Sequence, residues 1–378
     1  MVILSGPRQC GKTTLVSAIT ARRHGTYLNW DDPAAKRILL QFSLDPTVPL
    51  WTFDELHKFR RWRNFLKGLY DTTRPHQTQI LVTGSARLEL YGRGGDSLQG
   101  RYYPHHLHPL TLSELLRRSF PSPDEITALG REVPGHAETT LRDLFEYGGF
   151  PEPFGAADST EAARWRLQYG ERLVQEEVRS LEQVQELERL ALLYDRLATT
   201  IGSPLSLNGL REDLDVAFGT VKKWVEILDR LDAVFRIPPF GPPRIKAIKK
   251  EQKLYYWDWR RVEEPSARFE NLVAMHLYRC VDWLRDVHGQ QVELRYFRTR
   301  EGHEVDFLLL RGSQPWIAIE VKYSATSLAP GLKYLLERVP VPHGFQVHFQ
   351  GGEKTKAITV GSATIYCTPA TRFLAQLP

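Results

Sequence analysis

Short apolar runs separated by helical patterns occupy the first 115 residues of the chain. The run at residues 80–83 is continuous and ends in Gly84, as is typical of a buried parallel strand. Three further runs predict short strands at residues 2–4, 27–30 and 50–53. Helices are predicted at residues 12–22 and 58–69, the second because its apolar residues recur at helical spacing. Strands that alternate with helices predict an α/β sheet.

After residue 115 the predicted secondary structure changes first to mainly helices and then to mainly strands. Residues 139–200 carry an almost purely helical pattern. Two short helices around a small-residue turn at residues 217–219 then predict a helix-turn-helix. The proline-rich stretch at residues 237–244 cannot continue a helix and predicts a linker. Beyond it, strands are predicted around one helix at residues 269–285; they lie at residues 254–257, 292–297, 305–310, 316–321 and 346–349.

Length and composition limit the class of protein. A chain of 378 residues suggests two or three domains, and 42% apolar with 25% charged residues excludes wholesale disorder. No run approaches the roughly 18 apolar residues that cross a bilayer, and the opening residues lack the basic leader of a signal peptide. Three cysteines provide neither a disulfide framework nor a zinc cluster. We therefore expect a soluble, cytoplasmic protein without a membrane partner.

Charge is distributed unevenly along the chain. Residues 1–120 carry 17 Lys and Arg against 9 Asp and Glu, residues 121–198 carry 8 against 16, and the remainder carries 25 against 20. An acidic middle between basic ends favours contacts between segments or subunits, and a polyanionic partner for the ends. The alternative is that these charges are ordinary solvated faces.

Residues 6–13 match the phosphate-binding pattern G-x-x-x-x-G-K-[ST], or P-loop, at every fixed position, between a predicted strand and a predicted helix. Glycines let backbone N–H groups close on phosphates, and the helix N-terminus adds its positive dipole. Lys12 would reach the β- and γ-phosphates, and the Thr13 hydroxyl would ligate magnesium. Cys10 within this loop is either a redox-sensitive thiol or a tolerated small side chain. The pattern predicts a site for ATP and Mg²⁺ formed by Gly6, Pro7, Arg8, Gln9, Cys10, Gly11, Lys12, Thr13 and Thr14.

A P-loop needs a second acidic group on a neighbouring strand, and residues 51–55 provide an apolar strand that ends in two acids. Asp54 would hold magnesium through water, and Glu55 would orient and deprotonate the attacking water. The next apolar strand leads to Ser85, whose hydroxyl would sense the γ-phosphate. The alternative for each is a solvated loop residue.

ATPases of this kind often need a cation against the transition-state charge, commonly supplied by a neighbouring subunit. Arg101 is the first candidate for this role and Arg87 the second. The alternative for each is a surface arginine in a local ion pair.

Several of these motifs together resemble one family. They are residues 6–14, 54–58, 83–87, 94–101 and 107–114, followed by residues 148–152, 269–273 and 304–306. Over nearly its whole length the chain resembles the prokaryotic AAA-type ATPases that carry a C-terminal domain of unknown function with a PD-(D/E)xK nuclease-like fold. Such proteins usually have further residues ahead of the P-loop strand, so either those elements are absent here or the start lies inside a longer protein.

The resemblance implies an α/β protein of four parts. They are a P-loop AAA-type ATPase core at residues 1–118, a helical lid at 119–198, a helix-turn-helix (winged-helix-like) segment at 199–240 and an α/β PD-(D/E)xK nuclease-like domain at 241–378. The resemblance also implies self-association as a hexameric ring.

The predicted strands at residues 305–310 and 316–321 are joined by a turn and carry acids. Their hairpin can bring Asp306 beside Glu320, and Lys322 shares the face of Glu320 because side chains two residues apart in a strand point the same way. Neighbouring carboxylates suit a hard divalent cation, and Lys322 would stabilise developing phosphorane charge. The resemblance adds Glu270 as a further acid, so that Glu270, Asp306 and Glu320 are candidate metal ligands. A strand end with a solvated ion pair, or a degenerate nuclease fold that only binds nucleic acid, are the alternatives.

Basic residues follow the predicted turn of the helix-turn-helix: Lys222, Lys223, Arg244, Lys246, Lys249, Lys250 and Lys253. Such a cluster would neutralise phosphates and give salt-dependent binding of DNA. Alternatively, the helices only pack the ATPase core against the nuclease-like domain. The prediction is an ATP-hydrolysing protein that acts on DNA through a nuclease-like or DNA-binding domain. The alternatives are an ATP-driven translocase with an inactive nuclease domain, and a signalling-type ATPase switch that binds a protein partner.

Overall fold

The computed structural model describes residues 1–73, 78–84, 98–174, 186–241, 251–324, 327–352, 354–360 and 363–378. These residues form two compact units. Unit 1 comprises Met1–His108 together with Arg230–Asp232, and unit 2 comprises Pro109–Asp229 and Ala233–Pro378. Ser85 and Arg87, and Arg244, Lys246, Lys249 and Lys250 of the predicted DNA-binding cluster, lie outside the described residues.

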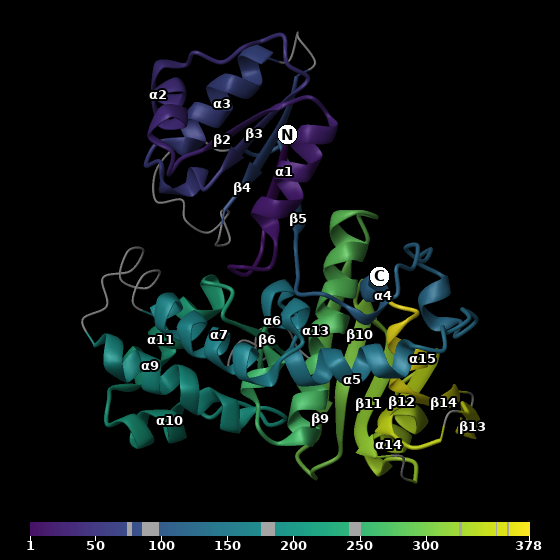
Figure 1. The fold of residues 1–378 in the computed structure, drawn as a ribbon. Helices are drawn as coiled ribbons and strands as arrows, with labels where there is room; N and C mark the ends of the chain where they lie inside the picture. Colours follow the sequence, from purple (N-terminus) through teal and green to yellow (C-terminus); the bar gives the residue numbers. More distant parts are fainter. Residues whose placement is uncertain are drawn as a thin grey trace. The chain divides into compact units, whose positions relative to one another are not determined.

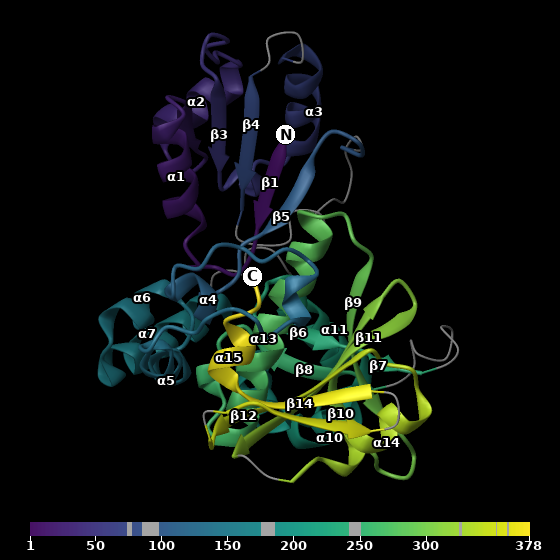
Figure 2. The ribbon, with the colours of Figure 1, turned by 90° about the vertical axis from the view of Figure 1, so that its right-hand side faces the viewer.

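Unit 1 is built on a parallel sheet with the strand order β2-β3-β4-β1-β5 (Figures 1 and 2). The predicted strands are confirmed as β1 (Val2–Ser5), β2 (Thr26–Asn29), β3 (Leu50–Asp54) and β4 (Gln79–Thr83). Sequence patterns did not predict the edge strand β5 (Tyr103–His106), which lacks an apolar run. It contains Pro104, and an edge is where a strand tolerates a missing backbone N–H. Because all five strands are parallel, their carboxyl ends meet at one edge of the sheet.

Helices cover both faces of this sheet. Helix α1 (Lys12–Arg22) places Val16 against Leu4, Leu50 and Leu81 on one face. Helices α2 (Pro33–Gln41) and α3 (Trp62–Thr73) pack on the other face, in a core that includes Ile3, Phe53 and Val82. The strands therefore alternate between two apolar cores, which explains why their sequences read as continuous apolar runs.

Unit 2 begins with a series of short helices. They are α4 (Leu112–Leu115), α5 (Ala137–Tyr147), α6 (Pro151–Ala156), α7 (Ser159–Arg172) and α9 (Leu187–Arg196), with 3₁₀ turns η3 (Glu125–Thr127) and η5 (Leu197–Thr200). The helical pattern predicted for residues 139–200 is thus divided. Helix α5 stops at Gly148, whose φ of 90° is left-handed, and Pro151 starts the next helix. Among the described residues, no helix is both long enough and apolar enough to cross a membrane.

Helices α10 (Leu207–Leu214) and α11 (Phe218–Arg230) are separated by three residues, of which Asp215 adopts the left-handed conformation. They precede strand β6 (Val234–Ile237), which pairs with the antiparallel strand β8 (Lys253–Tyr256). The pairing crosses the predicted domain boundary at residues 240/241. The linker predicted at residues 237–244 is wrong for residues 237–240: Ile237 ends β6, and β7 (Pro239–Phe240) forms the proline-containing edge of a larger sheet.

That larger sheet has the order β13-β14-β12-β11-β10-β9-β7 and mixes parallel and antiparallel pairs. The predicted strands are confirmed as β9 (Val292–Arg298), β10 (Glu304–Arg311), β11 (Gln314–Ser324) and β12 (His343–Gln350). Strands β13 (Lys356–Val360) and β14 (Ala363–Pro369) were not predicted. Strands β10 and β11 form the expected antiparallel hairpin, which pairs Phe307 with Ile319.

Three helices accompany this sheet: α13 (Pro265–Asp286), α14 (Pro330–Arg338) and the short α15 (Ala370–Leu374). Helix α13 is the predicted helix, extended by a proline at its start and capped by the Glu264 side chain. Helix α14 packs Leu332 and Leu335 against Leu308 of β10. The 3₁₀ turn η6 (Trp259–Arg261) connects β8 to the segment before α13.

Candidate functional sites in the two units

The P-loop of unit 1 follows β1 directly and ends where α1 begins. Gly6 has φ 144°, and a Cβ atom there would lie 2.1 Å from the carbonyl oxygen of Leu107. Gly11 has φ 100° at the N-cap of α1, and Gln9 has a strained φ of 62°. Gly11 has no side chain to cap the first N–H groups of α1. The loop therefore leaves these donors for an anion, as phosphate binding requires.

Lys12 lies back on this loop. Its Nζ donates to the carbonyl oxygens of Gly6 and Pro7, at 2.8 and 2.6 Å, and the residue is buried. The ammonium thus sits at the loop that would hold phosphates. A nucleotide offers it phosphate oxygens in place of these two neutral carbonyl oxygens, and charge-assisted hydrogen bonds are the stronger ones.

Thr13 and Asp54, the two predicted magnesium ligands, are in contact. The Thr13 hydroxyl donates to Asp54 Oδ2 at 2.8 Å, and Asp54 is buried at the end of β3. The Tyr27 hydroxyl from β2 donates to the same oxygen at 2.6 Å, and burial together with this bond raises the pKa of Tyr27 to about 12. Sequence patterns gave no signal for Tyr27. A hydroxyl and a carboxylate side by side are hard oxygen ligands, so these residues fit Mg²⁺.

Glu55 follows Asp54 in a left-handed conformation with φ 54°. Its carboxylate lies 3.2 Å from the Lys58 ammonium, which also contacts Asp31 at 2.5 Å. Because of the backbone turn after β3, the two acidic side chains point in different directions: Asp54 contacts Thr13, whereas Glu55 contacts Lys58. The two acids thus occupy separate positions, as their predicted roles of magnesium ligand and general base require.

Two other predicted positions of unit 1 are partly defined. Thr83 ends β4, fully buried, and its hydroxyl finds no hydrogen-bond partner among the described residues. Thr83 carries the described hydroxyl that is nearest in sequence to Ser85.

Arg101, the first candidate for the transition-state cation, forms an ion pair with Asp71 at 3.0 Å within the same unit. Burial raises the pKa of the Cys10 thiol, although Lys12 opposes it, so of the two alternatives from the sequence the redox-sensitive thiol, which needs a lowered pKa, is not favoured.

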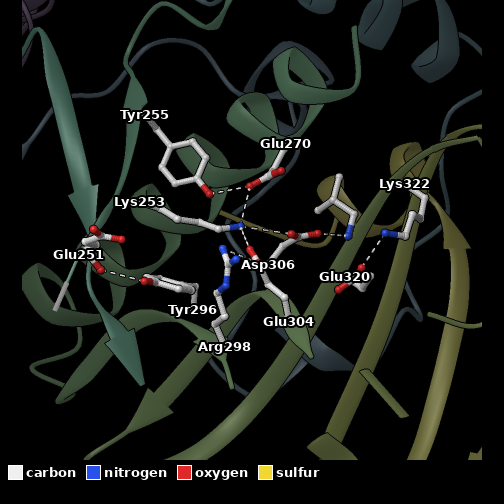
Figure 3. Close-up of polar contacts among 11 residues, drawn as sticks. Glu251, Lys253, Tyr255, Glu270, Tyr296, Arg298, Glu304, Asp306, Glu320 and Lys322 are labelled. Carbon is white, nitrogen blue, oxygen red and sulfur yellow. Dashed lines mark hydrogen bonds and ion pairs between the residues drawn. The ribbon is translucent and has the colours of Figure 1, made fainter. Parts of the chain in front are cut away.

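A carboxylate cluster in unit 2 surrounds the Lys253 ammonium (Figure 3). Lys253 Nζ lies 2.8 Å from Glu304, 3.1 Å from Glu270 and 3.3 Å from Asp306. The Lys253 side chain is completely buried at the start of β8. Glu270 comes from α13, and the other two acids come from β10. We call Lys253, Glu270, Glu304, Asp306, Glu320 and Lys322 the acid cluster.

The hairpin places Asp306 beside the second acid, as predicted. Asp306 Oδ2 accepts a hydrogen bond from the backbone N–H of Val321 at 2.9 Å, next to Glu320. Lys322 Nζ contacts Glu320 Oε1 at 2.7 Å, so these two side chains do share a face. Glu320 is buried, and its Oε2 atom finds no hydrogen-bond partner within the described ranges. Four of the six members of the acid cluster had thus been named from the sequence: Glu270, Asp306, Glu320 and Lys322.

Lys253 and Glu304 are the members that sequence reasoning missed. Lys253 was placed in a DNA-binding basic cluster, and this is wrong because its side chain is buried among acids. Glu304 carried a usable signal: it lies two residues before Asp306, hence on the same face of a strand. No local sequence pattern indicates that Lys253 contacts Glu304 and Asp306, which lie 51 and 53 positions away in the chain.

Burial and mutual repulsion change the acidity of the cluster. Burial, followed by the charge of Asp306, raises the pKa of Glu320 to about 8 and raises the pKa of Glu270. Burial would lower the pKa of Lys253, but the surrounding acidic groups raise it well above its ordinary value. Lys253 is therefore an ammonium ion at neutral pH, and Glu320 largely keeps its proton.

We expect the free energy of unfolding to fall as pH rises between about 4.5 and about 8 because of Glu320. The folded state binds this proton up to the raised pKa, whereas the unfolded chain releases it near its ordinary value. Over this interval the folded state binds more protons, so stability decreases with pH. Urea unfolding across the interval should show a flatter dependence in Glu320→Gln. The exposed Glu337→Gln is the control, and an unchanged dependence in Glu320→Gln would contradict the assignment.

The acid cluster does not fit a divalent ion in this arrangement. Among the described residues, no group of three His, Cys, Asp or Glu side chains gathers closely enough to hold one. The Lys253 ammonium stands 2.8–3.3 Å from three carboxylates, whereas Mg²⁺ needs oxygens at about 2.0–2.1 Å. The assignment of Glu270, Asp306 and Glu320 as metal ligands stays a prediction, and this geometry does not support it.

Residues 1–116 match the AAA domain family. With the parallel sheet, the P-loop and the Thr13–Asp54 contact, this makes unit 1 an AAA-type P-loop core. Residues 138–259 and 266–366 match two further families, each described as a domain of unknown function (DUF8612 and DUF4143).

The chain is similar to two whole proteins that are described as uncharacterized. The chain is 25% identical to the uncharacterized protein MJ1637 of Methanocaldococcus jannaschii, over 91% of this chain and 80% of that protein. It is 26% identical to the uncharacterized protein Rv2008c of Mycobacterium tuberculosis, over 86% and 71%. The chain is also similar, more weakly, to solved structures. It is 14% identical to the replication initiator DnaA bound to AMPPCP and single-stranded DNA, over 60% of this chain and 81% of that chain, with a TM-score of 0.30. It is 15% identical to the Aeropyrum pernix ORC1 protein in complex with DNA, over 72% of this chain and 86% of that chain, with a TM-score of 0.27. TM-scores this low assign neither a fold nor a function to this chain.

Proposed function

We propose that this protein binds and hydrolyses ATP through unit 1 and acts on DNA through unit 2. The observation that carries the ATPase proposal is the contact between Thr13 and Asp54 at the foot of a loop that already holds Lys12. It joins the end of β3 to the start of α1, two places 41 residues apart in the sequence, in the arrangement that a P-loop site for ATP and Mg²⁺ requires. Bound Mg²⁺ would supply positive charge to the β- and γ-phosphates of ATP.

The residues of the chain have separate tasks in this proposal. Lys12 turns from the loop carbonyl oxygens to the phosphates, Thr13 and Asp54 hold the ion, and Glu55 takes the proton of the attacking water. Release of Glu55 from Lys58 would free its carboxylate for that role. Ser85 is proposed to sense the γ-phosphate. Arg101 is proposed to act on a neighbouring subunit in a ring, for which it must leave Asp71.

The DNA proposal rests on unit 2 and on the resemblance to proteins with a nuclease-like domain. Helix α11 exposes Lys222 and Lys223 on the second helix of the pair. Asp306, Glu320 and Lys322 come from one hairpin, with Glu270 from the helix before it, as that resemblance implies. These features support a domain that contacts a phosphate backbone.

One observation favours a second candidate function, in which unit 2 binds DNA without cleaving it. Lys253 occupies the centre of the acid cluster, where a nuclease would need a metal ion. In this candidate, hydrolysis of ATP in unit 1 moves or remodels DNA that unit 2 only holds.

We expect the ATPase rate of the full chain to rise with single-stranded, duplex or branched DNA, and this stimulation to decline steeply as salt is added because phosphate contacts release counterions. Lys222→Ala/Lys223→Ala should weaken DNA binding, measured by fluorescence anisotropy, whereas exposed Lys333→Ala/Lys356→Ala serves as the control.

If DNA neither binds nor changes the ATPase rate, the DNA proposal fails, and a signalling-type switch with a protein partner replaces it. Cleavage of DNA by the wild-type chain in magnesium or manganese, lost in Asp306→Ala, would select the nuclease. DNA stimulation without cleavage would select the binding-only candidate.

A further inference from the structure

Three carboxylates lie around the Lys253 ammonium group (Figure 3). A lysine ammonium has three N–H donors and no acceptor. Lys253 Nζ donates hydrogen bonds to Glu270 Oε1 at 3.1 Å and to Asp306 Oδ1 at 3.3 Å, and it forms an ion pair with Glu304 at 2.8 Å. The ring of Tyr296 lies 5.6 Å from the same nitrogen, on the strand next to β10. Among the described residues, protein groups thus place three carboxylates within 3.3 Å of this ammonium.

The carboxylates are in turn held in place by groups other than Lys253. The Tyr255 hydroxyl donates to Glu270 Oε1 at 2.7 Å, Arg298 lies 3.4 Å from Glu304 Oε2, and the Val321 N–H donates to Asp306 Oδ2. Charge is compensated: the carboxyl groups of Glu270, Glu304 and Asp306, together with the largely protonated Glu320, meet three cations, Lys253, Arg298 and Lys322. Buried carboxylates need such compensation, since unpaired charges are costly away from water.

Two features show that this carboxylate arrangement is aimed at a cation and is more than a chance ion pair. Its oxygens come from a helix and from a strand, and the cation comes from a third element, β8. In addition, buried Glu320 has an oxygen that finds no hydrogen-bond partner in the described part of the chain. Glu270, Glu304 and Asp306 are thus arranged around one point, and the Lys253 ammonium occupies it.

We propose that the Lys253 ammonium is a built-in counter-ion that takes the place of a divalent metal ion in the acid cluster and keeps the cluster free of metal. This goes beyond the proposed function, because it holds whether or not unit 2 contacts DNA. Lys253 is kept in position by the β8–β6 pairing, in which it lies opposite Ile237. A divalent ion held by Glu270, Glu304 and Asp306 would lie against the Lys253 ammonium and be repelled by it, so removal of the ammonium should expose a site for Mn²⁺.

The test measures Mn²⁺ binding to the full chain without nucleotide, by the electron paramagnetic resonance signal of the free ion. All samples carry Asp54→Asn, which removes the carboxylate of the unit 1 site. With Lys253 intact, we expect no binding that depends on Asp306. Lys253→Met should gain about one ion per chain, and Lys253→Met/Asp306→Asn should lose it again. Mn²⁺ should also raise the melting temperature of Lys253→Met by several degrees and leave the parent unchanged.

Lys322→Met is the matched control, because that ammonium contacts Glu320 alone among the acids within ion-pair range and is part-exposed; it should gain no ion. Should Lys253→Met not fold, Lys253→Gln, which keeps a polar side chain but no charge at this position, replaces it under the same criteria. The proposal is overturned by Asp306-dependent Mn²⁺ binding with Lys253 intact. It is equally overturned by a folded Lys253 variant that binds no Mn²⁺, which would make the lysine a structural ion pair only.

Discussion

Lys12→Ala should abolish ATP binding and turnover while the fold of unit 1 survives. The lysine is the point charge of the P-loop, and among the described residues its ammonium donates to backbone carbonyl oxygens and the Cys10 sulfur only. Its removal therefore breaks no ion pair within the described ranges, yet it takes away the cation meant for the phosphates. Loss of one preorganised donor typically costs about 10²–10³ in rate, and the loss of a charge should reach at least that.

Binding of a fluorescent ATP analogue and phosphate release are the two measurements, with circular dichroism to verify folding. Lys36→Ala is the control, since Lys36 is an exposed lysine on α2 of the same unit. Normal ATP turnover by folded Lys12→Ala would refute the nucleotide site.

Glu55→Gln should retain ATP and lose its hydrolysis. The amide preserves the shape of the side chain but cannot accept the proton of the attacking water, and general-base catalysis contributes about 10²–10⁴ in rate. Asp54→Asn should instead weaken binding of Mg²⁺ with ATP, because Asp54 and not Glu55 contacts Thr13. The two substitutions at adjacent positions therefore predict two different defects.

Asp31→Asn is the matched control for Glu55→Gln. Asp31 contacts the same Lys58 ammonium, but its exposed side chain has no contact with Thr13 or Asp54 among the hydrogen bonds of the described residues. Single-turnover hydrolysis separates the variants, with nucleotide binding measured in parallel. Wild-type hydrolysis in Glu55→Gln would mean that another group serves as the base.

Much of unit 1 could be predicted because its signals are local. The apolar runs of β1, β3 and β4 correspond to strands buried on both faces, and the P-loop pattern lies within residues 6–13. Strand β5 escaped prediction since its sequence, Tyr-Pro-His-His, has neither an apolar run nor alternation. It becomes a strand by pairing with β1, which is a non-local interaction.

In unit 2 the sequence located acids but not their counter-ion. The i, i+2 relation of Glu320 and Lys322 and the hairpin that carries Asp306 follow from strand geometry, and the structure has both. The same spacing would have added Glu304. Lys253, however, was grouped with neighbouring basic residues, because a run of lysines is usually solvated and no local pattern marked this lysine as buried.

The sequence by itself determined the chemistry of the P-loop, the acid pair at the end of β3 and the hairpin acids, because each depends on residue type at short spacing along one element. Only the tertiary structure decided which cation meets the acids of unit 2. That choice depends on β8 pairing with β6 and lying beside α13 and β10, contacts that join Lys253 to residues 16, 17 and 53 positions away. Electrostatic energy depends on distance in space and on exclusion of water, and neither is encoded in the order of residues at this range.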